Sequence, residues 1–194
     1  MRGYFGIGAE RISKTMNVGS LFRSAHAFGA DFMFTVDAVY TRSKGGRSDT
    51  SDAPAHVPFY SFPTSDAMVL PEGCDLVGVE LIDGAVDLPS FRHPKQAAYI
   101  LGPERGELSP EMLEKCTYTI KIPTKFCINV GLAGAIVMYD RVKSLGKFTR
   151  RPMSSGDEPE PLTKHSYGGP VLRMQMNKYL DIPPIDKHYG LEEK

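Results

Sequence analysis

Three short segments of the chain carry polar side chains of the kind that bind ligands or move protons. Each segment adjoins an apolar run of sequence. Arg23 lies among apolar neighbours, where a guanidinium is costly unless an anion pairs with it, so it predicts contact with an anionic group. Taken singly, Glu104 also fits a solvated turn and Asn129 a plain helix cap. The segments are Asn17 with Arg23, Gly102-Pro103-Glu104 with Gly106, and Ile122-Pro123 with Cys127-Ile128-Asn129.

The third segment joins two recognisable elements. Residues 117–122 alternate β-branched and polar residues before Pro123, which predicts a strand and its end. Asn129 precedes an apolar run with helical spacing that reaches Gly146, so its side chain can cap a buried helix. Such a junction offers free backbone groups at the carboxyl edge of a sheet, a common ligand site in open α/β folds. A plain core strand–helix unit would give the same pattern.

The rest of the chain continues this alternation. A helix is expected from Asn17, whose side chain can cap it, to Gly29. A second helix is expected to start at Thr64–Leu70, and a third is expected to be capped by Ser109 with Pro110 in its first turn. The order predicts an α/β fold: a mainly parallel sheet flanked by helices on both faces. Strands are expected at Tyr4–Ala9, Phe32–Val36, His56–Phe62 as an edge strand, Asp75–Ile82 and Ala97–Leu101.

Composition narrows the class of protein. The 194 residues fit one domain, expected at 1–147, with a Pro-rich tail at 148–194 that packs on the domain or on a partner. Net charge is zero, so any basic patch is local. Three widely spaced cysteines without a CxxC argue against disulfides and a zinc site, and no segment resembles a signal peptide or membrane span. We therefore expect a cytoplasmic protein without metal or membrane contact.

Two basic segments are candidates for binding a phosphate backbone. The stretch 41–52 has no periodicity and holds cations around Gly45-Gly46, and the start of the tail holds two adjacent arginines. For the stretch 41–52, a solvated loop whose charges have no binding role explains the sequence equally well. Further along the tail, a short helix is expected at 171–179. The candidate RNA-binding residues are Arg42, Lys44, Arg47, Arg150 and Arg151.

Together and in this order, the three segments resemble the signature motifs of SpoU/TrmH-type RNA methyltransferases in the SPOUT superfamily. The first motif is NVGSLFRSAHAFGAD, the second LGPERGELSPE and the third IPTKFCINVGLAGAIVMYD. The resemblance covers about residues 13–146. It implies a C-terminal trefoil knot, a homodimer and S-adenosylmethionine bound bent in the knot. It also implies methyl transfer to a ribose 2′-hydroxyl of tRNA or rRNA.

The resemblance assigns roles to individual residues. Arg23 would bind the adjacent phosphate and stabilise the developing alkoxide; direct proton removal requires a strongly depressed pKa. Asn17 would orient Arg23 or the ribose, Glu104 would hold its loop or pair with an arginine, and Asn129 would cap its helix and fix the knot loop. The residues expected to line the cofactor pocket are Leu101, Gly102, Ile122, Cys127 and Ile128.

The chain departs from the family pattern in its third motif. Many relatives carry Ser-Leu-Asn where this chain has Cys127-Ile128-Asn129, and a thiol is a weaker hydrogen-bond donor than a hydroxyl. The loop from Ile122 to Cys127 also looks shorter and lacks glycine. With no separate N-terminal RNA-binding domain, RNA affinity is expected from the core and tail. Two alternatives are a knotted RNA- or cofactor-binding protein without turnover and a base methyltransferase of the superfamily. A third is an ordinary nucleotide-binding Rossmann enzyme, but the glycine-rich fingerprint of such enzymes is missing after the first strand, where the chain has only GIGAER.

Overall fold

The computed structural model describes residues 3–39 and 53–146, which form a seven-stranded sheet with helices on both faces. Every strand pair is parallel, in the order β3-β2-β1-β6-β4-β7-β5. The strands are β1 (Tyr4–Glu10), β2 (Phe32–Val36), β3 (Phe59–Phe62), β4 (Asp75–Val79), β5 (Val86–Asp87), β6 (Gln96–Leu101) and β7 (Tyr118–Lys121). The helices are α1 (Thr15–Phe28), α2 (Ala53–His56), the 3-10 turn η1 (Leu88–Ser90), α3 (Pro110–Lys115) and α4 (Val130–Leu145).

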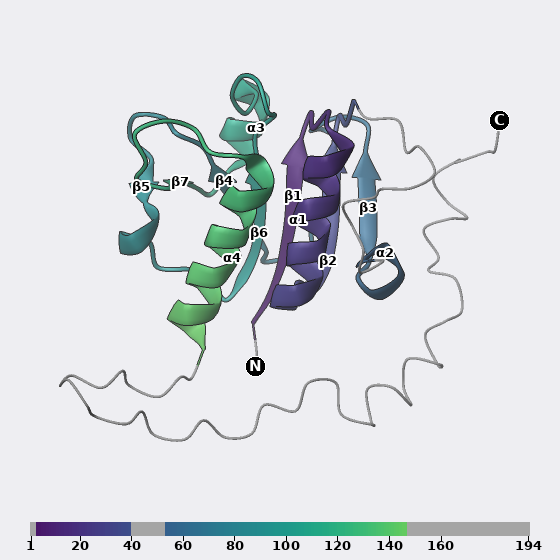
Figure 1. Ribbon diagram of the computed structural model, residues 1–194, viewed down its shortest axis with the longest axis horizontal. Coiled ribbons are helices and arrows are strands. Elements are labelled where there is room, and N and C mark those ends of the chain that lie inside the picture. Colours follow the sequence, from purple (N-terminus) through teal and green to yellow (C-terminus); the bar gives the residue numbers. More distant parts are fainter. Residues whose placement is uncertain (1–2, 40–52, 147–194) are drawn as a thin grey trace. The chain divides into compact units, whose positions relative to one another are not determined.

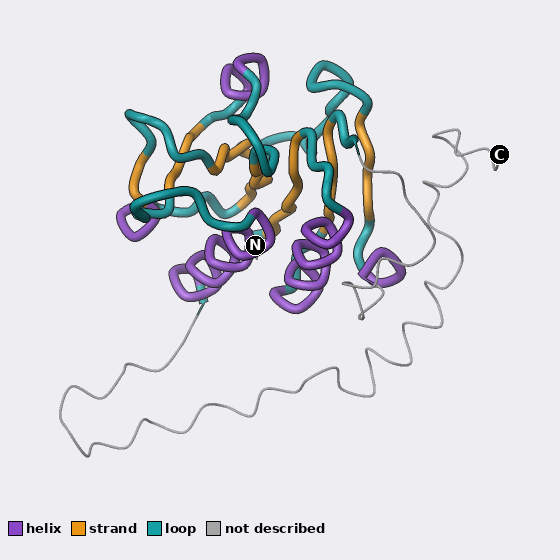
Figure 2. The backbone as a smooth tube through the Cα atoms, turned by 45° about the horizontal axis from the view of Figure 1, so that its top comes forward, coloured by secondary structure: helices purple, strands orange, loops and turns teal. Residues whose placement is uncertain are grey.

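The helices lie in two layers. Helices α1 and α4 lie side by side on one face of the sheet, as both views show (Figures 1 and 2). They meet closely because α4 carries Gly134 at the contact, where a Cβ would lie 2.3 Å from Cδ1 of Leu21. On the other face, Met112 of α3 packs in a second core with Phe34 and Ile100. The predicted α/β architecture is confirmed.

Strand β6 shows how the sequence fills both layers. It lies between β1 and β4, and all of its residues from Ala97 to Leu101 are buried. Tyr99 and Leu101 belong to the core under α1 and α4, whereas Ala98 and Ile100 belong to the core under α3. This alternation is the period of two that a strand imposes, applied to a strand with no solvent face.

Several predicted boundaries are corrected. No helix forms at Thr64–Leu70; there Oγ1 of Thr64 accepts a hydrogen bond from the N–H of Ala67, which closes a turn instead. The segment beginning at His56 opens with the end of α2, and its strand starts only at Phe59. Strand β4 ends at Val79 rather than Ile82, and the two-residue strand β5 has no sequence signal of its own.

Two predicted segments of the chain lie outside the described residues. One is the tail at 148–194, which includes the helix expected at 171–179. The other is the basic stretch 41–52. The predictions for both segments stay predictions. The trefoil knot stays a prediction. No helix in the described ranges is long and apolar enough to span a bilayer.

Candidate functional site

A cavity of about 390 Å³ opens at the carboxyl ends of β4, β6 and β7. We call it the strand-end cavity. It brings together the second and third sequence segments and the start of α1. Its apolar walls are Val79, Leu81, Leu101, Ile122, Ile128, Val130 and Ala133. Its polar and small residues are Lys14, Asn17, Glu80, Gly102, Pro103, Glu104, Gly106, Thr124, Cys127 and Asn129.

A chain of hydrogen bonds joins the three segments along one side of this cavity. Nδ2 of Asn17 donates to Oε1 of Glu104 at 2.9 Å, and Oδ1 of Asn17 accepts from Nδ2 of Asn129 at 2.9 Å. Oδ1 of Asn129 in turn accepts the N–H of Gly131 at 2.9 Å, which confirms Asn129 as the cap of α4. The side chain of Asn17 is buried, so both of its polar ends need these partners.

Glu104 also caps α1 from a distant loop. Its carboxylate accepts the backbone N–H groups of Ser13 and Lys14 at 3.0 and 2.9 Å, and the Ser13 hydroxyl at 2.9 Å. The helix begins at Thr15, and Lys14 at the cap position supplies no side-chain bond. The expectation that Asn17 caps this helix is therefore wrong: Asn17 lies inside the first turn, and Glu104 takes the capping role.

The charge of Glu104 follows from these bonds. Partial burial alone would raise the pKa of its carboxyl, but the hydrogen bonds from Ser13, Lys14 and Asn17 outweigh it and lower the pKa to about 2. Glu104 is thus an anion at neutral pH with both oxygens engaged. It suits a structural role at the cavity and does not suit proton donation.

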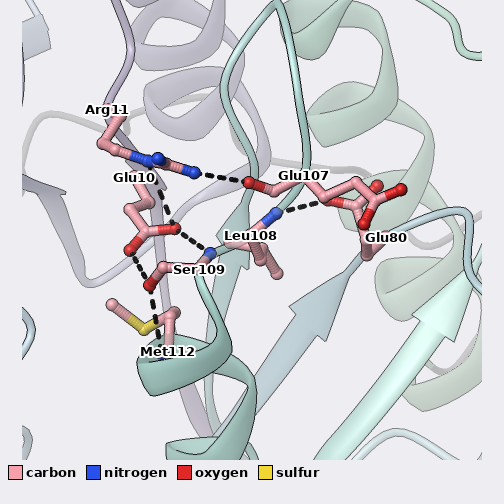
Figure 3. A network of polar contacts seen from close by, with 7 residues as sticks. All are labelled: Glu10, Arg11, Glu80, Glu107, Leu108, Ser109 and Met112. Atoms are coloured by element: carbon pink, nitrogen blue, oxygen red, sulfur yellow. Dashed lines mark hydrogen bonds and ion pairs between the residues drawn. The ribbon is translucent and has the colours of Figure 1, made fainter.

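Two further carboxylates hold the loop between β6 and α3 (Figure 3). Oε2 of Glu80 accepts the N–H of Leu108 at 2.9 Å, and Glu10 accepts both the N–H and the hydroxyl of Ser109. A Cβ on Gly102 would lie 2.7 Å from Oε2 of Glu80, so a larger residue here requires the Glu80 side chain or the loop to shift. Both acids stand at the carboxyl end of a buried strand, since Glu10 is the last residue of β1 and Glu80 directly follows β4.

The opposite wall is the loop from Ile122 to Asn129. Oγ1 of Thr124 donates to the backbone oxygen of Phe126 at 2.9 Å, which tightens the turn. Ile128 is half-buried and Cys127 is exposed, and both line the cavity. The loop therefore presents apolar side chains and backbone groups rather than charge. The described residues hold no group of three or more His, Cys, Asp or Glu side chains that could bind a metal ion.

The structure does not bring Arg23 to the strand-end cavity within one chain. The buried face of α1 is taken by residues such as Leu21, Phe22 and Ala25, which leaves Arg23 exposed rather than among apolar neighbours. It lies six positions after Asn17, about 9 Å along a helix. All the other predicted catalytic and cofactor residues line the cavity. The five candidate RNA-binding residues, Arg42, Lys44, Arg47, Arg150 and Arg151, lie outside the described residues.

Comparison with known families decides the classification. The model of the SpoU rRNA methylase family matches residues 5–139, which is more than half of the chain. The chain belongs to the SpoU family. The match spans all three segments and every lining residue of the strand-end cavity.

Individual relatives share the fold of this SpoU protein at low identity. The SpoU methyltransferase AviRb from Streptomyces viridochromogenes, solved with AdoMet, is 21% identical with a TM-score of 0.66, over 74% of this chain and 61% of that one. The AdoMet-bound rRNA methyltransferase from Sinorhizobium meliloti is 19% identical with a TM-score of 0.67, over 76% and 59%.

A curated mouse protein is related in sequence. The tRNA (guanosine(18)-2′-O)-methyltransferase TARBP1 of Mus musculus is 24% identical over 159 residues, which is 78% of this chain and 10% of that protein. The SpoU chain therefore spans only a tenth of this relative and about three fifths of the two solved structures.

Proposed function

We propose that this SpoU protein is an S-adenosylmethionine-dependent methyltransferase that modifies a ribose 2′-hydroxyl of RNA, with tRNA ahead of rRNA as the substrate. The observation that carries the proposal is the strand-end cavity with its Glu104–Asn17–Asn129 chain. This arrangement joins all three family segments at one site. The mouse relative named for tRNA 2′-O-methylation supports tRNA as the substrate.

The cavity suits the methyl donor on physical grounds. Its volume of about 390 Å³ lies within the range of small-molecule sites, roughly 300–1,000 Å³. Leu101, Ile122 and Ile128 offer apolar walls for an adenine ring, and the two loops offer backbone donors and acceptors beside them. When bound, S-adenosylmethionine supplies a methyl group activated by a positive sulfur.

The chain's own residues then position the reactants. Glu104 and Asn129 clamp Asn17, so the first turn of α1 and the start of α4 keep a fixed spacing at the cavity wall. A fixed wall matters because transfer requires the hydroxyl oxygen, the methyl carbon and the sulfur in line. The acceptor ribose enters past this wall, and the apolar side chains exclude water from the transfer path.

Arg23 acts from a second copy of the chain in this proposal. Leu132, Ile136 and Tyr139 form an exposed apolar row on α4, at 62%, 40% and 53% exposure, with the helical spacing of one face. Helix α1, which carries Arg23, packs beside α4. A homodimer that covers this face would place the guanidinium of one protomer toward the partner's cavity, where it would bind a phosphate and stabilise the alkoxide.

Calorimetry and a methylation assay test the function. Purified protein is titrated with S-adenosylmethionine and, separately, with NAD; we expect heat only from the first. The protein is then incubated with labelled donor and unmodified tRNA or rRNA, and Arg23→Ala is expected to keep donor affinity and lose transfer. Binding of NAD alone would restore the Rossmann alternative, and donor binding without transfer to any RNA would support a binding protein without turnover.

A further inference from the structure

A second hollow adjoins the strand-end cavity and is rich in positive charge. Its volume is about 360 Å³, and we call it the basic hollow. It shares one wall with the strand-end cavity, formed by Lys14, Pro103 and Glu104. The residues that line it are Arg11, Ser13, Lys14, Pro103, Glu104 and Arg105.

The cations of this hollow outnumber the anion that lines it. Glu104 is the single acidic residue among the lining side chains, and its two oxygens already accept four hydrogen bonds. Within the described ranges, no carboxylate oxygen lies within 4.0 Å of the charged groups of Lys14 or Arg105. Both cations are therefore available to an incoming anion.

Arg11 adds a backbone observation. It is one of two non-glycine residues with a positive φ in the described ranges, at 48°, where a long side chain is rarely found. Its N–H donates to the backbone oxygen of Val36 at 2.8 Å, and its guanidinium donates to that of Glu107 at 2.7 Å. The guanidinium thus reaches across from the end of β1 to the loop before α3 (Figure 3). Strained residues held in this way cluster at binding sites.

We propose that the basic hollow binds the phosphodiester group directly 3′ of the acceptor ribose. This inference rests on the proposed function. A 2′-hydroxyl and its own 3′-phosphate are attached to neighbouring ring carbons, so an RNA that presents one to the strand-end cavity must place the other within a few bonds. The strand-end cavity and the basic hollow share the wall at Lys14 and Pro103, so they are close enough to hold the 2′-hydroxyl and its 3′-phosphate at the same time. The phosphate would be held by Lys14 and Arg105, together with Arg23 of the partner subunit, to which the proposed function also gives a phosphate contact. Arg11 lines the same hollow, and its Nε lies 4.0 Å from Oε2 of Glu10.

One other anion could use the same cations, namely the carboxylate of the methionine part of the donor, because Lys14 also lines the strand-end cavity. The test therefore measures both ligands. The double variant Lys14→Gln/Arg105→Gln is compared with Arg92→Gln/Lys95→Gln, which removes the same two charge types. Those control residues are exposed and precede β6, so they lie at the sheet edge opposite the cavity.

Affinity for unfractionated tRNA is measured against KCl concentration, and S-adenosylmethionine affinity is measured by calorimetry. Phosphate contacts do not depend on sequence, so tRNA serves as a probe even if the substrate is rRNA. We expect the hollow variant to bind tRNA about tenfold more weakly than the control near 100 mM salt. Its salt slope should be lower by about 1 to 2, as for the loss of one to two phosphate contacts.

Three results are decisive. Equal tRNA affinity and salt slope in the two double variants would overturn the proposal, as would a wild-type protein with no tRNA affinity. A loss of S-adenosylmethionine affinity in the hollow variant, with or without a loss of tRNA affinity, would assign the cations to the donor carboxylate and also overturn it. Failure of the wild-type protein to bind the donor would count against the proposed function, and the RNA-binding comparison would still report on the hollow.

Discussion

Nδ2 of Asn129 donates a hydrogen bond of 2.9 Å to Oδ1 of Asn17, across 112 positions of the chain. The bond fixes the orientation of both amides, because Nδ2 of Asn17 is committed to Glu104 and Oδ1 of Asn129 is committed to the N-terminus of α4. The starts of α1 and α4 are thereby tied to the loop after β6. Three separate segments of sequence depend on one another at this point.

Replacing Asn17 with alanine should destabilise the fold despite the better helix propensity of alanine. The change removes two hydrogen bonds, one to the half-buried Glu104 and one to the exposed Asn129, and each such bond contributes about 0.5–1.5 kcal/mol. Urea unfolding followed by circular dichroism measures the free energy of unfolding. The control Ser20→Ala changes an exposed residue of the same helix and should stay within about 0.5 kcal/mol of the wild type. Equal free energies of unfolding for the two variants would show that the hydrogen bonds of Asn17 do not stabilise the fold.

Glu104 predicts a specific acid sensitivity. Its folded-state pKa is lowered to about 2 from an ordinary value of 4.5, so the stability it contributes is present above about pH 4.5 and is lost as the pH falls toward 2. Glu104→Gln should therefore be less stable than the wild type at pH 7, and this difference should shrink between pH 4.5 and 2. Unfolding free energies measured across that range test it. Exposed Glu114→Gln is the control, and an unchanged difference across the range would contradict the prediction.

Gly102→Ala should weaken donor binding. The new Cβ would lie 2.7 Å from Oε2 of Glu80 and 3.2 Å from the N–H nitrogen of Leu108, the two groups that hydrogen-bond to each other. Either the Glu80 carboxylate, which anchors Leu108, or the loop that forms one cavity wall must then shift. We expect at least a tenfold loss of S-adenosylmethionine affinity by calorimetry, whereas the control Gly84→Asn, at a turn with open space around it, should bind normally. Unchanged affinity in Gly102→Ala would mean that this loop does not shape the donor site.

The sequence was sufficient where a local signal decides the structure. Asn129 before an apolar run marked the start of α4, and Ser109-Pro110 marked that of α3. The start of α1 was misplaced because its capping group, Glu104, lies about 90 positions away, and no local pattern reports such a partner. Glu80 was missed for the same reason.

Arg141 is a second residue whose setting the sequence hides. In sequence it resembles a surface cation at the end of a helix, yet it is 4% exposed and donates to the backbone oxygens of Tyr4, Pro94 and Lys95. Arg23 is the reverse case, since apolar sequence neighbours suggested burial and the helix turns it outward. Both errors have one physical cause: which face of a helix is buried depends on its packing partner, which is remote in sequence.

Ribose methylation is tested most directly by the product. RNA labelled from methyl-labelled S-adenosylmethionine is hydrolysed with alkali, which cleaves only beside a free 2′-hydroxyl. We predict that the wild-type protein places label in alkali-stable dinucleotides, and that Arg23→Ala, which still binds the donor, places none. Label in mononucleotides would show base methylation instead. No transfer to tRNA or rRNA by a protein that binds the donor would contradict the account altogether.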